Sequence, residues 1–141
     1  MKKYLFMAMA AFMLVLASCG GSKFNDKKAG ELIDKYKDYE SIQNMSQDEA
    51  NEVADLVIAY YNDLAKAAEK SAGETDAKKL KEANDNFEKD HKNADKLLGI
   101  YNSLPDSKLT TEKKNAVTDA KDKCTKAAEK AADKTKAALN N

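Results

Sequence analysis

The stretch SQDEANEVADLVIAYYNDLAKAAEKSAG, residues 46–73, decides the fold class of this chain. Its apolar side chains recur at steps of three and four residues, the repeat of one face of an α-helix. That face is formed by Val53, Val57, Tyr60, Leu64 and Ala67. Ser46 is a suitable N-cap, Glu49 completes the pattern of a capping box, and Gly73 is a suitable stop. The stretch therefore predicts one long amphipathic helix.

Stripes with the same spacing occur on both sides of this helix. They predict a shorter helix over residues 26–43 and long helices over residues 74–102 and 110–139. Pro105 separates the last two helices, because proline disfavours the helical conformation for the residue before it. No segment alternates apolar and polar residues long enough to indicate a strand. We predict an all-α domain: an up-down antiparallel bundle of three long helices plus one shorter N-terminal helix.

The last predicted helix is unusually rich in alanine. Its stripe consists of Val117, Ala120, Cys124, Ala127, Ala131 and Ala138. Alanine lets two helix backbones approach closely but buries little apolar area, and hydrophobic stabilisation scales with that area. We expect this helix to be the most weakly held. It either frays, or its face is completed by a second copy of the chain.

The N-terminus has a different character. Lys2 and Lys3 precede an uncharged, mostly apolar stretch from Tyr4 to Ala17. These roughly 14 residues are too short for a membrane-spanning helix, which needs about 20. A positive start followed by a short apolar stretch is typical of a secretory signal peptide. The end of the stretch, Leu16-Ala17-Ser18-Cys19, resembles the lipobox of bacterial lipoproteins.

The resemblance covers residues 1–19 and implies a processing scheme. The chain would be cut between Ser18 and Cys19, and Cys19 would carry the lipid, including a fatty acyl group such as palmitate. Residues 1–18 would then be a removed signal peptide, residues 19–25 a lipidated flexible tether, and residues 26–141 the helical domain. In the enteric members Asp after the cysteine retains the protein in the inner membrane, so Gly20 favours the outer membrane of a Gram-negative bacterium. The lack of an acidic run near Cys19 favours its periplasmic face over the cell surface.

Composition gives no support for several classes of partner. Without Lys2 and Lys3, the chain has 22 Lys against 24 Asp and Glu, a net charge of −2. That balance gives no reason to expect a nucleic acid partner. Every basic residue is Lys, and Lys lacks the planar fork with which Arg grips phosphate or carboxylate groups.

The two cysteines have separate roles on this interpretation. Cys19 is used for the lipid, so Cys124 has no disulfide partner within the chain. Its place on a helical stripe predicts a small buried apolar residue. An intermolecular disulfide is the alternative.

The sequence offers little for catalysis or metal binding. His91 is the one candidate general base and has no second His at metal spacing. It lies near the edge of its stripe, so we expect a boundary residue with one side in water. The functional alternative is a haem with His91 and Met45 as its axial ligands. We expect no enzyme activity, no metal and no cofactor.

The aromatic residues suggest how the domain could act. Tyr36, Tyr60, Phe87 and Tyr101 lie on core stripes, which predicts core packing. Tyr39 and Tyr61 lie off the main stripes and could form an exposed surface for a protein partner, since Tyr is favoured at interfaces.

Two functions from different classes follow. The first is a lipid-anchored envelope protein that acts through protein contacts, as a spacer, adaptor or inhibitor. The alternative is a carrier of a small apolar ligand, with a pocket between the helices lined by tyrosines.

Overall fold

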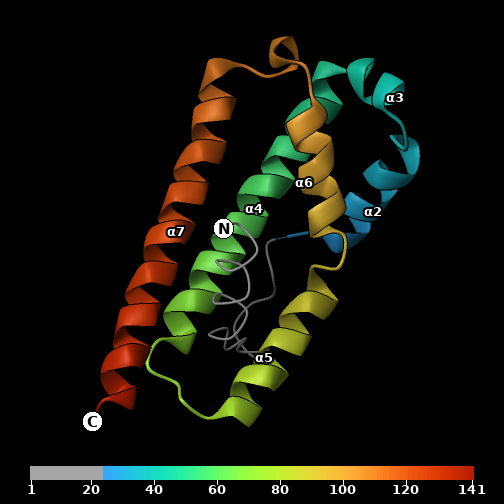
Figure 1. The fold of residues 1–141 in the computed structure, drawn as a ribbon. Helices are drawn as coiled ribbons and strands as arrows, with labels where there is room; N and C mark the ends of the chain where they lie inside the picture. The colour runs from blue at the N-terminus through green and yellow to red at the C-terminus, as the bar shows by residue number, and fades with distance from the viewer. Residues whose placement is uncertain (1–23) are drawn as a thin grey trace.

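The computed structural model describes residues 24–141, and within them every regular element is a helix (Figure 1). The all-α prediction is confirmed. In chain order the elements are α2 (Asp26–Lys35), α3 (Tyr39–Gln43), α4 (Gln47–Ser71), α5 (Ala77–Asp90), α6 (Ala94–Ser103), the 3-10 helix η1 (Asp106–Lys108) and α7 (Thr111–Leu139).

The two long helices α4 and α7 lie side by side and run in the same direction (Figure 1). Near their starts, Lys113 Nζ lies 2.7 Å from Asp55 Oδ1. Near their ends, the backbone N–H of Gly73 donates to Thr135 Oγ1 over 3.1 Å. α5 and α6 return the chain in the opposite direction, and α6 packs against both α4 and α2.

The predicted third long helix is wrong: residues 74–102 form two helices, α5 and α6, separated at His91–Asn93. Side-chain contacts stabilise the break between the two helices. The Nδ1 atom of His91 lies 2.7 Å from the carbonyl oxygen of Phe87. The backbone N–H of Asn93 donates to Asp26 Oδ1 at 2.9 Å, so a carboxylate from α2 satisfies the start of α6.

The predicted helix over residues 26–43 is also divided, into α2 and α3. Asp38 caps α3: its Oδ1 atom accepts from the backbone N–H of Ser41 at 2.7 Å, and the Ser41 side chain reaches back to the backbone of Asp38. This reciprocal cap starts a new helix after Tyr36.

Ser46 caps α4 as predicted, accepting from the backbone N–H of Glu49 at 3.2 Å. The predicted return bond from the Glu49 side chain is wrong. That carboxylate instead accepts from Lys35 Nζ at 2.6 Å and from the Tyr36 hydroxyl at 2.7 Å. Both oxygens of the Glu49 carboxylate therefore connect α4 to the end of α2. These bonds hold the pKa of Glu49 below its usual value.

The core has two parts of different composition. One cluster joins α2, α3, α4, α6, the first half of α7 and the aromatic side chains, with Met45, Val53, Leu64 and Leu97 among its most buried members. The predicted core positions of Tyr36, Tyr60 and Phe87 are confirmed, and Tyr101 is half-buried against the cluster. The second cluster consists of Ala68, Ala127 and Ala131 between α4 and α7.

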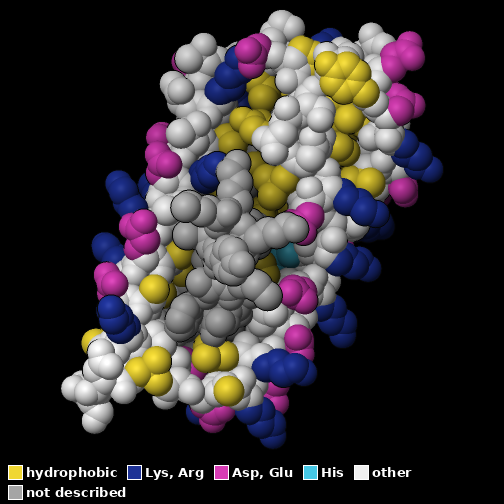
Figure 2. All heavy atoms as spheres, in the orientation of Figure 1, with side chains coloured by type: hydrophobic (Ala, Val, Ile, Leu, Met, Phe, Trp, Pro, Cys, Tyr) yellow, Lys and Arg dark blue, Asp and Glu magenta, His cyan; other side chains and the backbone are white. Residues whose placement is uncertain are grey.

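The prediction that Ala138 ends the buried stripe of α7 is wrong, because Ala138 is exposed and Thr135 is buried instead. The Thr135 hydroxyl donates to the carbonyl of Ala131 and accepts from Gly73, so its polar atom is satisfied. Charged side chains of both signs cover the outer edges of the molecule, over α7 on the left and over α2 and α5 on the right (Figure 2).

Gly73 follows α4 with φ of +87°, in the left-handed region that only glycine adopts without cost. We expect Gly73→Ala to lower the free energy of unfolding by about 1–2 kcal/mol. A Cβ atom there meets nothing within 4 Å, so the cost comes from the backbone alone. Urea unfolding followed by circular dichroism measures it.

Gly99 is the matched control, because it lies inside α6 and a Cβ atom there also meets nothing within 4 Å. Gly99→Ala should raise the free energy of unfolding by up to about 1 kcal/mol, from helix propensity. Two changes of the same sign would contradict this account of Gly73.

Candidate functional site

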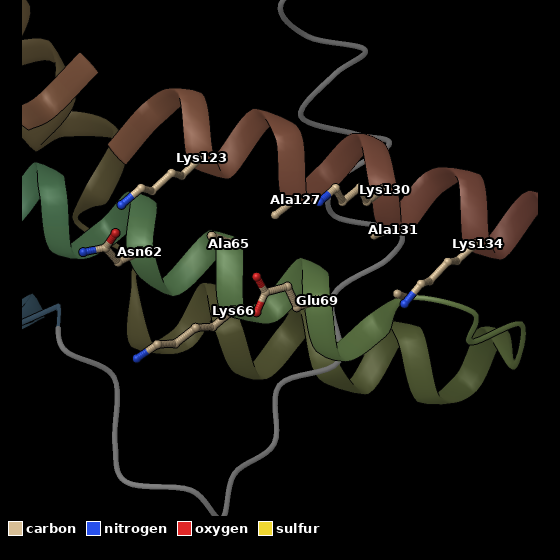
Figure 3. A pocket seen from close by; sticks show the side chains of 10 residues that line it. Asn62, Ala65, Lys66, Glu69, Lys123, Ala127, Lys130, Ala131 and Lys134 are labelled. Atoms are coloured by element: carbon tan, nitrogen blue, oxygen red, sulfur yellow. The ribbon is translucent and has the colours of Figure 1, made fainter. Parts of the chain in front are cut away.

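A groove of about 460 Å³ runs between α4 and the second half of α7 (Figure 3). Its apolar lining consists of Ala65, Ala72, Ala127 and Ala131. Because all four are alanines, the helices approach closely and no large side chain fills the space between them. The alanines on both helices are therefore the direct cause of the groove.

The rim of the groove is cationic. Lys66 extends from α4, and Lys123, Lys130 and Lys134 extend from α7 (Figure 3). Glu69 is the one acidic residue in the lining. All five of these side chains are exposed. Exposed charges contribute little to affinity singly, but together they attract and orient an anionic partner.

A second arrangement, on another side of α4, surrounds His91. Its Nε2 atom lies 2.9 Å from Asp63 Oδ2, and Asp63 Oδ2 also accepts from the backbone N–H of Phe24 at 3.1 Å. His91 is 8% exposed and Asp63 7%. The expectation of a half-wet boundary residue is wrong, because Asp63 gives the ring a buried polar partner.

Aromatic rings enclose this histidine. The Phe87 ring stacks on it with centroids 3.8 Å apart, and the Phe24 ring lies 5.2 Å away. Tyr60 lies 5.7 Å from it at a tilt. The Phe87 carbonyl oxygen can only accept, and so can an ionised Asp63 carboxylate, so the ring has an oxygen acceptor beside each nitrogen. Such a packed, bonded ring links α4, α5 and the start of the described chain.

Met45 is fully buried just before α4, whereas His91 lies beside Asp63, sixteen residues into that helix. About 24 Å of helix separates the two levels, which is too far for the two axial positions of one haem. Among residues 24–141, no group of three or more His, Cys, Asp or Glu side chains is placed to hold a metal ion.

The structure does not bring Tyr39 and Tyr61 together. Tyr39 starts α3 at one end of the molecule and is 69% exposed. Tyr61 lies halfway along α4, half-buried against the core, and burial raises the pKa of its phenol. α7 packs on that side of α4, which is why Tyr61 is less exposed than expected. Neither tyrosine lines the groove, whose lining holds no aromatic residue.

The predicted cleavage point between Ser18 and Cys19 lies outside the described residues. The lipid attachment at Cys19 therefore stays a prediction. Within residues 24–141, no helix combines the length and the apolar character that crossing a membrane requires.

The prediction that Cys124 is buried is confirmed. Burial raises the pKa of its thiol to about 11, from an ordinary value of 9.0. The folded chain therefore holds about 100-fold less thiolate at pH 8 than the unfolded chain. We expect iodoacetamide to alkylate Cys124 at least about 100-fold more slowly in buffer than in denaturant, measured by mass spectrometry with Cys19 replaced by Ser.

The raised pKa of the Cys124 thiol also determines how the stability of the fold changes with pH. Because the pKa of Cys124 is higher in the folded chain, its neutral thiol contributes fully to the free energy of unfolding below the unfolded pKa of about 9. That contribution is lost as the pH rises toward 11. Equal alkylation rates in buffer and denaturant would contradict the buried position.

The groove lysines and Asp63 were not among the predicted site residues. Lys123, Lys130 and Lys134 recur at steps of seven and four, so they share one face of a helix beside the alanines. Asp63 interrupts the apolar stripe between Tyr60 and Leu64. Both signals are present in the sequence. Comparison of this chain with protein-family models, with curated proteins and with solved structures finds no match.

Proposed function

We propose that this chain is a lipid-anchored helical domain of the bacterial cell envelope that acts by binding another protein rather than by catalysis. The observation that carries the proposal is the α4–α7 groove, with its alanine lining and its lysine rim. The resemblance of residues 16–19 to a lipobox supports the anchor at Cys19. Gly20 after the cysteine and the lack of an acidic run near it support a place at the outer membrane, on the periplasmic face.

The groove favours one kind of partner: an acidic amphipathic helix. Alanines on both walls leave room for a helix that presents small apolar residues, as in other close helix contacts. Four lysines against one glutamate favour acidic side chains on either side of that apolar face. A small apolar ligand is less well matched, because a charged rim gives it no compensating contact.

The test is photo-cross-linking in intact cells, with a photoreactive amino acid at Lys130 on the groove rim. The same residue at Lys78, exposed on α5, is the control. We expect an adduct from position 130 whose cross-linked peptide is an acidic helical segment of another envelope protein. The double variant Lys123→Glu, Lys134→Glu should remove that adduct by reversing part of the rim.

Three results would contradict the proposal. One is the same set of adducts from positions 130 and 78. Another is an adduct that persists after the charge reversal. The third is an adduct only with a second copy of this chain, which would replace the acidic partner by self-association.

A further inference from the structure

Phe24 fixes the start of the described chain to the middle of the molecule. Its backbone N–H donates to Asp63 Oδ2 at 3.1 Å, and its ring lies 5.2 Å from His91 and 5.8 Å from Tyr60. The side chain is buried. These contacts lie within the part of the chain that remains after cleavage at Cys19.

The segment between the proposed anchor and this attachment point is short. Cys19 precedes Phe24 by five residues. Even fully extended, a chain of that length reaches only about 18 Å. An acylated Cys19 would therefore hold the bilayer surface close to Phe24.

One end of the molecule is out of reach of that tether. Asp63 lies sixteen residues after Gln47, which corresponds to about 24 Å along α4. α3 and η1 lie at the far end of this distance (Figure 1). The α3 end of the domain is therefore farther from Phe24 than the extended tether can reach.

The groove lies on a different side of α4 from Phe24. At about 100° per residue, Tyr60 and Asp63 point to one side of the helix. The groove residues Asn62, Ala65 and Glu69 point to a side roughly 130–170° away. A tether that brought the groove to the bilayer would have to pass half-way around α4, a path of about 16–19 Å for a helix about 10–12 Å across, which would use nearly all of its extended length.

We propose that the short tether makes the Phe24 side the membrane-proximal side of the domain, facing a phospholipid surface, and turns the groove and the α3 end away from the bilayer. The inference rests on the proposed lipidation of Cys19. It leaves the groove accessible to a protein from the aqueous side.

The test uses the full chain, produced in a bacterial host and purified in its lipidated form. Three separate variants each place a single cysteine, at Lys92 directly after His91 in the sequence, at Lys130 on the groove rim, or at Glu40 on α3. These three positions are exposed. Each carries a fluorophore, and Cys124 is buried and slow to react. The protein is reconstituted in phosphatidylethanolamine and phosphatidylglycerol vesicles that contain a phospholipid with a spin-labelled headgroup.

We expect quenching at position 92 to be at least about twofold stronger than at positions 130 and 40, because a helix width of about 10 Å or more separates them. Inserting about 12 Gly and Ser residues between Ser22 and Lys23 should abolish the difference, because the longer tether no longer selects a side.

Equal quenching at the three positions, or stronger quenching at position 130, would overturn this inference while leaving the anchor intact. A difference that survives the insertion would overturn the tether as its cause. An N-terminal peptide without an acyl group on Cys19 would overturn both this inference and the anchor in the proposed function. Mass spectrometry of that peptide separates the cases.

Discussion

Asp63→Ala is expected to lower the free energy of unfolding by about 2–4 kcal/mol, because it removes the acceptor that two buried hydrogen bonds share. The carboxylate accepts from His91 Nε2 at 2.9 Å and from the Phe24 backbone at 3.1 Å. Alanine removes the acceptor that both buried donors share. Each donor then lies out of water without that hydrogen bond, which costs free energy. Urea unfolding of the chain without residues 1–18 measures the loss.

Two variants control this experiment. Asp133→Ala, at an exposed site on α7, should change the free energy of unfolding by less than about 0.5 kcal/mol. The double variant Asp63→Leu, His91→Phe should recover part of the loss, since apolar replacement of a buried pair is often neutral. A single variant as stable as the parent would show that the pair contributes nothing.

Leu64→Ala is expected to cost about 2–5 kcal/mol, from lost burial and from the cavity that remains. Leu64 is 2% exposed, in the cluster that joins α4 to the aromatic side chains. Thermal and urea unfolding both report the change. The matched control is Leu139→Ala, because Leu139 is 69% exposed and should cost less than about 0.5 kcal/mol.

Comparable losses for the two leucine variants would contradict the buried position of Leu64. Most of the buried apolar volume lies in the larger cluster, to which Leu64 belongs. The cluster of Ala68, Ala127 and Ala131 contributes close packing with little buried area.

The helices could be predicted from sequence where local signals decide. Ser46 caps α4 as predicted, accepting from the backbone of Glu49, and Thr110 at the start of the predicted 110–139 helix caps α7, accepting from the backbone of Lys113. The breaks after Lys35 and Asp90 could not be predicted from periodicity alone. Local contacts contribute to each, the Asp38–Ser41 cap at the first and the His91–Phe87 contact at the second. Both also depend on contacts distant in sequence: Tyr36 bonds to Glu49, and Asp26 bonds to Asn93.

The candidate site was less predictable than the fold. His91 was expected at the edge of the core because its stripe position says nothing about Asp63, which lies 28 residues away and becomes its partner only in three dimensions. The groove lysines resemble ordinary surface charges in the sequence. Their common rim exists because α4 and α7 meet along alanines, and no periodicity within α7 specifies which helix lies opposite.

The pairing of α4 with α7 also sets the order in which the domain can be completed. Asp55 and Lys113 are 58 residues apart in sequence, and Gly73 and Thr135 are 62 apart. Contacts of such separation form only after the intervening chain has closed, which slows folding. A nascent chain that ends before Thr111 lacks the helix that covers this side of α4. The domain therefore stays incomplete until residues 111–141 are available.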